Sequence, residues 1–397
     1  MSLTKQSYGW DPALKFHIPA DVLTHFREAV PRGAHMEDEW NSLFGRYAQA
    51  HPELAREFTR AAERKLPEQG AEIWRTSVPK LEPATPMATR EAQGKVLDAI
   101  MPKLPLVIGG SADLTPSNNT RFKGATDFSR DNPSGRYLRF GVREHAMGAI
   151  LNGIALSDML IPYGATFFVF LDYMRGAVRL AAVSHYPVIF VYTHDSIGLG
   201  EDGPTHQAVE QFASLRAMPG IVVLRPADAT ETAAAWKFAL EHRNGPVAIA
   251  LTRQKVPVID RNRYASADNL ERGAYILASG MNPRVLLIAT GSEVGLAMQA
   301  YDRLAAEDIS ARVVSMPSWE LFERQSRAYQ DVVLPPEISA RVGIEAGVRM
   351  GWERYIGAQG KFIGMSSFGA SAPAEALFTG FGITVDAIVD AAKRAMA

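Results

Sequence analysis

Short apolar runs that alternate with helix-forming segments constrain the fold of this chain more than any other feature. Residues 104–108, 188–192, 221–224 and 247–251 are apolar, and Gly, Pro or polar residues bound them. An Ala-rich helix candidate at residues 230–242 separates the last two runs. Strands that are apolar along their whole length are typical of a parallel sheet with helices on both faces.

The same alternation returns after a polar stretch at residues 260–268. Here the expected elements are strands at 285–288, 311–314 and 342–345, a helix at 294–306, and a final helix capped by Thr384. We therefore predict an α/β protein with two three-layer α/β/α domains and mainly parallel sheets. Their expected bounds are residues 81–265 and 266–397.

The first 80 residues differ because they contain helical patterns without a strand candidate. Apolar side chains recur at helical spacing in two stretches, which are Trp40, Leu43, Phe44 and Tyr47, and Leu54, Phe58 and Ala61. The prolines within residues 80–87 predict a linker. We expect residues 1–80 to be the helical remnant of an α/β domain whose body is missing, together with the start of this linker.

Composition excludes several classes of function. The 397 residues carry 42 Lys plus Arg against 43 Asp plus Glu, and this balance disfavours a nucleic-acid binder. There is no cysteine, so disulfides, thiolate metal ligands and cysteine nucleophiles are excluded. No apolar run approaches the ~18 residues of a membrane span, and the N-terminus lacks a signal-peptide core. We expect a cytoplasmic protein without nucleic-acid or membrane partners.

Glu144 is the first candidate for chemistry. It lies in Phe140-Gly-Val-Arg-Glu-His-Ala-Met-Gly148, which opens a helix rich in small residues through Ala155. A glutamate in the first turn is often only a favourable partner of the helix dipole. The alternative is that the small neighbours admit a flat ring, and that Glu144 is a sheltered acid/base group. These residues leave both interpretations open.

An aromatic cluster follows, formed by Tyr163, Phe167, Phe168, Phe170 and Tyr173. Phe167, Phe170 and Tyr173 recur at a spacing that predicts a shared helical face. Such stripes are usually part of a core, and a wall that stacks on a ligand ring is the alternative.

The third cluster is the loop from Thr193 to His206, which contains two His, three acidic residues and three Gly. It follows the run at 188–192, and α/β sheets bind ligands at the carboxyl ends of their strands. A structural loop and a metal site with His194, Asp195 and His206 are alternatives, but the spacing matches no helical zinc pair. Substrate binding is favoured. No Walker A motif, G-x-G-x-x-G strand-turn-helix unit or G-x-S-x-G elbow occurs, which weakens nucleotide-dependent phosphoryl transfer and serine hydrolysis.

Several segments are similar to the signature segments of transketolases and occur in the same order, and the resemblance runs from about Tyr8 to the C-terminus. These are Gly110-Ser-Ala-Asp-Leu-Thr-Pro-Ser-Asn118, Gly141-Val-Arg-Glu-His-Ala-Met147, His194-Asp-Ser-Ile-Gly198, Glu201-Asp-Gly-Pro-Thr-His-Gln207, Arg225-Pro-Ala-Asp228 and Ser367-Phe-Gly-Ala370.

The resemblance implies thiamine diphosphate as cofactor and transfer of a two-carbon ketol unit between sugar phosphates of the xylulose 5-phosphate and ribose 5-phosphate class, in the pentose phosphate pathway. Glu144 resembles the glutamate that hydrogen-bonds N1′ of the aminopyrimidine and promotes the tautomer that activates the thiazolium. Implied cofactor contacts are Asp113, Phe167, Phe170 and Tyr173. Implied substrate groups are His206 and Asp202 for the donor carbonyl and hydroxyls, and Arg90, Ser117, His194 and Arg253 for the phosphate. The family also implies a homodimer.

The chain departs from the family because no Gly-Asp-Gly occurs in it. In transketolases that motif belongs to the diphosphate-binding domain, so the Mg²⁺ or Ca²⁺ ligands are expected in the missing part and no metal ligand is assigned here. We expect a shortened chain with impaired activity alone and a separate diphosphate-domain chain as a possible partner. The alternatives are a β-type subunit of a 2-oxo acid dehydrogenase, a deoxyxylulose-phosphate-synthase-like enzyme, and a non-catalytic interaction module.

Overall fold

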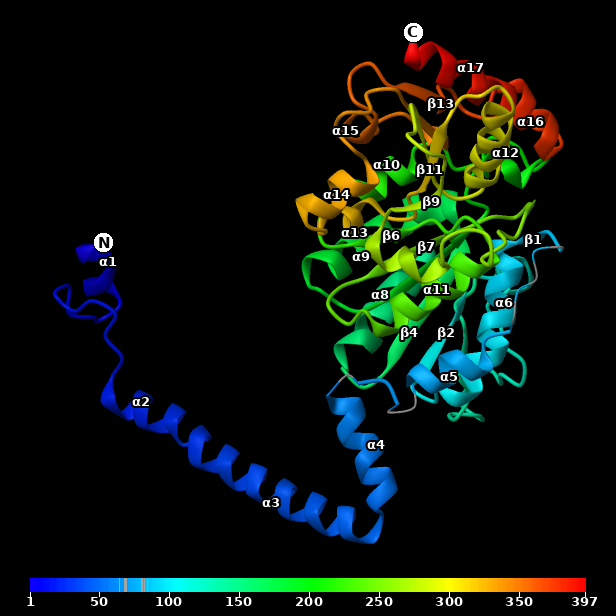
Figure 1. The fold of residues 1–397 in the computed structure, drawn as a ribbon. Helices are drawn as coiled ribbons and strands as arrows, with labels where there is room; N and C mark the ends of the chain where they lie inside the picture. The colour runs from blue at the N-terminus through cyan, green and yellow to red at the C-terminus, as the bar shows by residue number, and fades with distance from the viewer. Residues whose placement is uncertain (64, 68–69, 80, 82, 84) are drawn as a thin grey trace. The chain divides into compact units, whose positions relative to one another are not determined.

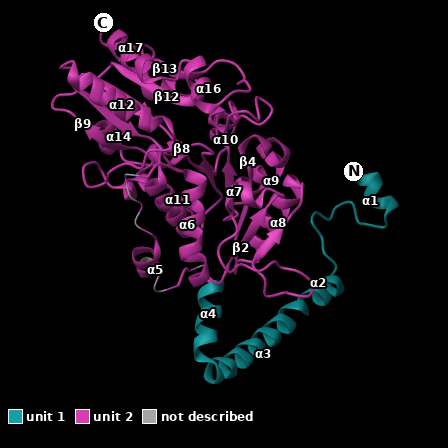
Figure 2. Cartoon of the chain, turned by 90° about the vertical axis from the view of Figure 1, so that its right-hand side faces the viewer, with its two compact units in different colours: residues 1–62 teal, residues 63–397 magenta. Residues whose placement is uncertain are grey.

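The chain divides into two compact units, residues 1–62 and residues 63–397 (Figure 2). The computed structural model describes residues 1–63, 65–67, 70–79, 81, 83 and 85–397. The predicted linker at 80–87 lies partly outside the described residues, because 80, 82 and 84 are not among them.

The first unit is helical, as predicted, and its described residues contain no strand. Its helices are α1 (Ser2–Ser7), α2 (Ala20–Arg27), α3 (Ala29–Ala50) and α4 (Pro52–Ala62). The two apolar stripes lie on α3 and α4. Phe44 connects them, with ring centroids 5.8 Å from Trp40 and 5.4 Å from Phe58. Trp40 nevertheless remains 50% exposed.

A six-stranded sheet, in which every pairing is parallel, forms the first part of the second unit (Figure 1). Its strands, in spatial order, are β3 (Tyr137–Arg139), β2 (Val107–Ser111), β4 (Ile161–Phe167), β5 (Ile189–Thr193), β7 (Val247–Leu251) and β6 (Val222–Leu224). The predicted strand at 104–108 is shifted to β2, which includes Gly109 and Gly110. These glycines are needed within the strand, because a Cβ on Gly109 would lie 2.1 Å from the Tyr163 carbonyl oxygen.

Helices cover both faces of this sheet. One face packs on α6 (Thr89–Ile100) and α11 (Ala229–Glu241), and the other on α8 (Glu144–Leu156), α9 (Leu171–Val183) and α10 (Gln211–Arg216). Alternate residues of β5 enter the two cores: Val191 faces the first, Phe190 and Tyr192 the second. The three-layer prediction is confirmed for this sheet.

The second sheet has five strands, and the strand that comes first in the sequence forms an antiparallel edge. Its order is β13 (Lys361–Met365), β12 (Arg341–Val348), β10 (Val285–Ala289), β11 (Ala311–Ser315) and β9 (Tyr275–Ser279). Only β9 runs antiparallel to its neighbour. The mainly parallel arrangement is therefore confirmed.

Helices also cover both faces of the second sheet. One face packs on α12 (Glu293–Ala306) and α17 (Val385–Met396), and the other on α13 (Trp319–Glu323), α14 (Arg327–Val333) and α15 (Glu353–Ile356). The predicted cap is confirmed, because the Thr384 hydroxyl accepts a hydrogen bond from the Ala387 N–H.

Short elements complete the unit. They are α5 (Gly70–Ser77), α7 (Thr115–Asn118), α16 (Ala374–Gly380), the 3₁₀ helices η1 (Met101–Lys103), η2 (Phe168–Phe170), η3 (Ile197–Leu199) and η4 (Ala267–Arg272), and an antiparallel pair, β1 (Met87–Ala88) with β8 (Lys255–Val256). Within the described residues, no helix is both long enough and apolar enough to cross a membrane.

Candidate functional site

The predicted site residues gather at the carboxyl edge of the six-stranded sheet. Asp113 follows β2, Glu144 begins the helix after β3, Phe167 ends β4, His194 follows β5, and Arg253 follows β7. Parallel strands end at the same edge, so these residues share one edge although they are distant in sequence. With strands ~4.8 Å apart, they spread along the edge in the order β3, β2, β4, β5, β7.

Glu144 is the first residue of α8 and is 8% exposed. Its carboxylate makes no hydrogen bond or ion pair with the residues that the structure describes, which leaves the helix dipole as its favourable environment. Helix α8 packs against β4 and α9, the elements that carry Phe167 and Tyr173. A sheltered carboxylate without a partner suits a ligand that donates a hydrogen bond.

The aromatic wall forms, but not on one helix as the spacing predicted. Phe167 is the last residue of β4, Phe170 belongs to η2 and Tyr173 to α9. The helical prediction is wrong because residues 161–167 pair with strands on both sides, and these sheet hydrogen bonds override the local periodicity.

The three rings still form a continuous surface. Phe167 and Phe170 are nearly parallel, at 8° and 5.8 Å between centroids, and Phe170 lies 5.9 Å from Tyr173. Tyr173 is 68% exposed, so part of this surface is open. Tyr163 and Phe168 are instead fully buried, against Trp236 and Phe212 respectively, as the core interpretation predicted.

The loop from Thr193 to His206 borders the aromatic wall. The His194 ring stacks on Phe167 at 3.7 Å, and the His206 ring lies edge-on to Phe170 at 5.5 Å. His194 has a left-handed backbone with φ of 60°, and its Nδ1 lies 2.7 Å from the Thr193 hydroxyl. Burial and the nearby cations Arg90 and Arg253 lower the pKa of His194 to about 3, so its ring is neutral at pH 7.

The predicted phosphate residues also come together. Thr89 and Thr252 bond reciprocally, with N–H to hydroxyl distances of 2.9 and 2.7 Å, and so hold the adjacent Arg90 and Arg253 close. Arg90 Nη1 donates to the Ser117 carbonyl at 2.7 Å. Burial and the charge of Arg253 lower the pKa of Arg90. Arg253 is exposed, and it pairs with no carboxylate among the described residues.

The two remaining acids are less closely connected to the rest. Asp113 is exposed, has a φ of 61°, and lies near Arg139 at the end of β3. Asp202 is exposed on the loop between His194 and His206, and in the described part of the chain it makes no hydrogen bond or ion pair.

Asp195 turns away from the site toward Arg225 instead of joining His194 and His206. Among the described residues, no group of three His, Asp or Glu is placed to hold a metal ion.

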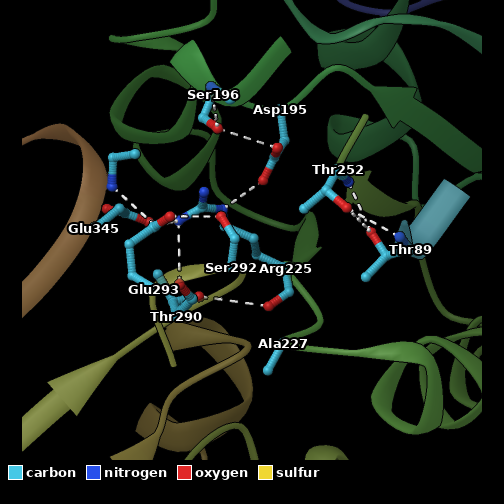
Figure 3. A network of polar contacts seen from close by, with 12 residues as sticks. Thr89, Asp195, Ser196, Arg225, Ala227, Thr252, Thr290, Ser292, Glu293 and Glu345 are labelled. Atoms are coloured by element: carbon cyan, nitrogen blue, oxygen red, sulfur yellow. Dashed lines mark hydrogen bonds and ion pairs between the residues drawn. The ribbon is translucent and has the colours of Figure 1, made fainter. Parts of the chain in front are cut away.

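Sequence reasoning missed a buried ion network around Arg225 (Figure 3). Arg225 is fully buried, and its guanidinium donates to Asp195, to Glu293 and to the Thr290 carbonyl. Burial alone would lower the pKa of Arg225, but Glu293 and Asp195 raise it above its ordinary value. One signal in the sequence could have indicated this network. Arg225 directly follows the apolar run at 221–224, so its side chain is expected near the core and not on the surface.

Glu345, on β12, extends this network. It accepts a fork of two 2.8 Å hydrogen bonds from Arg216 and a third bond from the Trp352 ring N–H. Arg216 lowers the pKa of Glu345 despite complete burial. The carboxylate is therefore held in its ionised form between the two sheets.

Comparison with known proteins gives three matching family profiles. They are described as "Transketolase, pyrimidine binding domain" over residues 85–258, "Transketolase-like TK C-terminal domain" over 273–384, and "Transketolase, thiamine diphosphate binding domain" over 1–67. The chain is 50% identical to a transketolase of Geobacillus stearothermophilus over 98% of its own length and 58% of that relative. It is 49% identical to a chloroplastic transketolase of Craterostigma plantagineum over 98% of its own length and 75% of that relative.

Solved structures agree. The structure of a Pichia stipitis transketolase complex with sedoheptulose-7-phosphate matches with a TM-score of 0.91 and 42% identity, over 98% of this chain and 57% of that one. A structure described as a split gene transketolase, inactive beta4 tetramer, matches with a TM-score of 0.64 and 28% identity, over 78% of this chain and 98% of that one. The chain thus spans little more than half the length of most of the relatives it matches.

Proposed function

The chain belongs to the transketolase family, and from this premise we propose that it supplies the half of a thiamine-diphosphate site that binds the aminopyrimidine ring and a sugar phosphate. The reaction would transfer a two-carbon ketol unit from a ketose phosphate to an aldose phosphate. One observation carries the proposal: an open aromatic wall, a sheltered carboxylate and two close arginines occupy one edge of one sheet. We assign residues 81–265 to a pyrimidine-binding domain and 266–397 to a C-terminal domain.

The residues present fit the aminopyrimidine. The surface of Phe167, Phe170 and Tyr173 suits a flat ring, and Glu144 offers an unpaired carboxylate to a ring nitrogen. When bound, the cofactor supplies the carbon nucleophile that attacks the ketose carbonyl. The role of Glu144 is to hold a proton at the pyrimidine N1′, and Asp113 would lie near the cofactor. We assign no residue of this chain as a ligand of the Mg²⁺ or Ca²⁺ that is expected for the family.

The residues on the β5 and β7 side suit a phosphorylated sugar. Arg90 and Arg253 provide two guanidinium groups for a phosphate dianion, with His194 and Ser117 beside them. His206 borders the wall, where it and Asp202 would orient the donor carbonyl and hydroxyls. From β4 to β7 is two strand spacings, or ~10 Å, which leaves room for a chain of several carbons between ring and phosphate.

We also propose a homodimer. Helices α8 and α9 expose an apolar face, and large exposed apolar faces mark protein contacts. Its members, with their exposed fractions, are Ile150 at 49%, Leu156 at 61%, Tyr173 at 68%, Leu180 at 51% and Val183 at 62%. A second copy of the chain is proposed to cover this face, and a separate diphosphate-domain chain is proposed as a further partner. Sedimentation equilibrium of the wild type and of Leu180→Glu tests the dimer, which this charge should dissociate.

A cytoplasmic location also remains a proposal.

Calorimetric titration with xylulose 5-phosphate and ribose 5-phosphate tests the proposed function. We expect saturable binding that the unphosphorylated sugars do not show. Ketol transfer is then assayed with the chain alone and with a diphosphate-binding chain added, which also tests the expectation that the chain alone turns over poorly. Turnover of 2-oxo acids without dependence on sugar phosphate would favour the β-type subunit alternative. Binding of neither cofactor nor sugar phosphate would favour an interaction module.

A further inference from the structure

We propose that Arg225 is a positioning residue through which the second sheet fixes the conformation of the His194 loop. The inference rests on the proposed function only in giving His194 a substrate to contact. It gives the C-terminal sheet a defined role at a site that lies on the other sheet.

Arg225 lies between the two sheets. It follows β6 of the six-stranded sheet, yet its backbone N–H donates to the Pro317 carbonyl at 2.9 Å and its carbonyl accepts from the Gly291 N–H at 3.2 Å. Both of those partners belong to the second sheet's connections. Gly291 has a φ of 59°, and a Cβ there would lie 2.5 Å from Arg225 Nε. The close approach of a glycine is therefore part of how the guanidinium is seated.

The Arg225 guanidinium donates hydrogen bonds to residues of both sheets (Figure 3). Arg225 Nε donates to Asp195 Oδ2 at 2.9 Å on the first sheet, and Nη1 donates to Glu293, the first residue of α12, on the second. All three side chains are at most 1% exposed. A planar fork reaches two carboxylates at fixed angles, which a single ammonium group cannot reproduce.

Asp195 helps to fix the backbone conformation of His194. It directly follows His194, whose left-handed φ of 60° is unfavourable for a residue with a Cβ. Such a conformation persists only where the surroundings fix it. On one side the Thr193 hydroxyl and the Phe167 ring hold the imidazole. On the other side the Arg225–Asp195 bond anchors the next residue, so that the peptide cannot relax to an extended conformation.

Among the described residues, Glu293 makes no hydrogen bond with the His194 loop itself. Its carboxylate also accepts from the N–H of Ala346 on β12 at 2.9 Å and from the hydroxyl of Ser292, the residue before α12, at 2.5 Å. Glu293 therefore reaches Asp195, the neighbour of His194, through Arg225. It has a second connection toward the site through Ser292, whose hydroxyl accepts from the Gln254 side chain at 3.2 Å.

A second buried network across the same two sheets provides a matched control. Glu231 of α11 accepts from the Tyr275 hydroxyl at 2.5 Å and from the Ser315 hydroxyl at 2.7 Å, and these two partners belong to β9 and β11. Among the described residues, Glu231 makes no hydrogen bond or ion pair with the His194 loop. Tyr275→Phe thus removes a buried bond between the sheets without cutting the connection to His194.

The test is the NMR spectrum of the full chain labelled with ¹³C at histidine, with the His194 signal assigned from the His194→Gln variant. In the wild type, we expect stacking on Phe167 to shift this signal upfield. Arg225→Lys and Glu293→Ala are expected to move it back toward the value of an unstacked histidine, and Tyr275→Phe to leave it in place. Where Arg225→Lys fails to unfold cooperatively, Glu293→Ala decides by the same signal.

A folded Arg225→Lys or Glu293→Ala variant with an unchanged His194 signal would overturn the proposal, as would an equal shift in Tyr275→Phe. Titration with inorganic phosphate distinguishes this failure from a failure of the proposed function. We expect Arg225→Lys to weaken phosphate binding about tenfold, equivalent to ~1.4 kcal/mol. Should the wild type bind no phosphate while the variant still shifts His194, the positioning role stands and the proposed substrate is wrong.

Discussion

Charged residues near the carboxyl ends of the strands fall into two groups, those without a partner of opposite charge and those buried in ion pairs, and the six-stranded sheet carries both, because Asp195 and Arg225 belong to the buried group. On the six-stranded sheet, Arg253 is exposed, and neither Glu144 nor Arg253 has a partner of opposite charge among the described residues. On the five-stranded sheet, Glu293 and Glu345 are fully buried, and arginines satisfy both. The same place in an α/β fold is thus proposed to bind a ligand where its charges are unpaired, and it joins one sheet to another where they are buried and paired.

Glu144→Gln should give the largest functional effect and little change in stability. The substitution keeps the shape but removes the carboxylate proposed to hold the proton, and such groups contribute about 10²–10⁴-fold to rate. We expect a loss of at least ~100-fold in ketol transfer by the enzyme complemented with a diphosphate-binding chain. Urea denaturation should show only a small change in midpoint, because the charge of Glu144 loses its interaction with the helix dipole, worth about 0.3–1 kcal/mol, and no ion pair. Normal turnover by this variant would place the chemistry elsewhere.

Glu345→Ala should give the reverse pattern. It leaves the buried Arg216 fork without an acceptor, and breaking a buried pair costs about 3–5 kcal/mol. The check is the free energy of unfolding in urea. Glu353→Ala is the matched control, since its pair with Arg349 is about half exposed and should have little effect. Equal stability of the two variants would contradict the distinction drawn between covered and open charges.

Arg253→Ala should weaken sugar phosphate binding without affecting the fold. Loss of a charge-assisted bond corresponds to about 1.5–3 kcal/mol, or roughly 10–100-fold in affinity. Calorimetry with ribose 5-phosphate measures this, with ribose as the unphosphorylated control ligand. Lys255→Ala removes an equal charge two residues away, at an exposed position of β8, and should change the affinity far less. Equal losses would indicate general attraction by charge instead of a site.

The effect of His194 protonation on stability should be absent at neutral pH and visible only in acid. Its folded-state pKa is lowered from 6.5 to about 3, so the folded chain binds fewer protons than the unfolded chain between these values. The stability associated with the neutral ring is fully present above pH ~6.5 and is lost as the pH falls toward 3. Its NMR signal should stay constant from pH 8 to pH 5. A midpoint near 6.5 would show that the ring is solvated and not seated on Phe167.

Much of this organisation was predictable from the sequence. The continuous apolar runs predicted the strands, because a strand buried on both faces admits few polar residues. The position of the His194 loop at the carboxyl edge followed from its place after such a run. The local spacing of Phe167, Phe170 and Tyr173 was misleading, because pairing of β4 with two neighbours depends on distant residues. The partners of Arg225 were not predictable, since Asp195 and Glu293 lie 30 and 68 positions away.

The most direct test of the central claim is a titration of the histidine-labelled chain with ribose 5-phosphate, because histidines lie at both edges of the six-stranded sheet. His194 and His206 are at the carboxyl edge, whereas His185 and His242 precede β5 and β7 at the amino edge. Saturable shifts of the His194 and His206 signals, with His185 and His242 unchanged, are predicted. Shifts confined to His185 or His242, or none at His194 at saturation, would contradict the account.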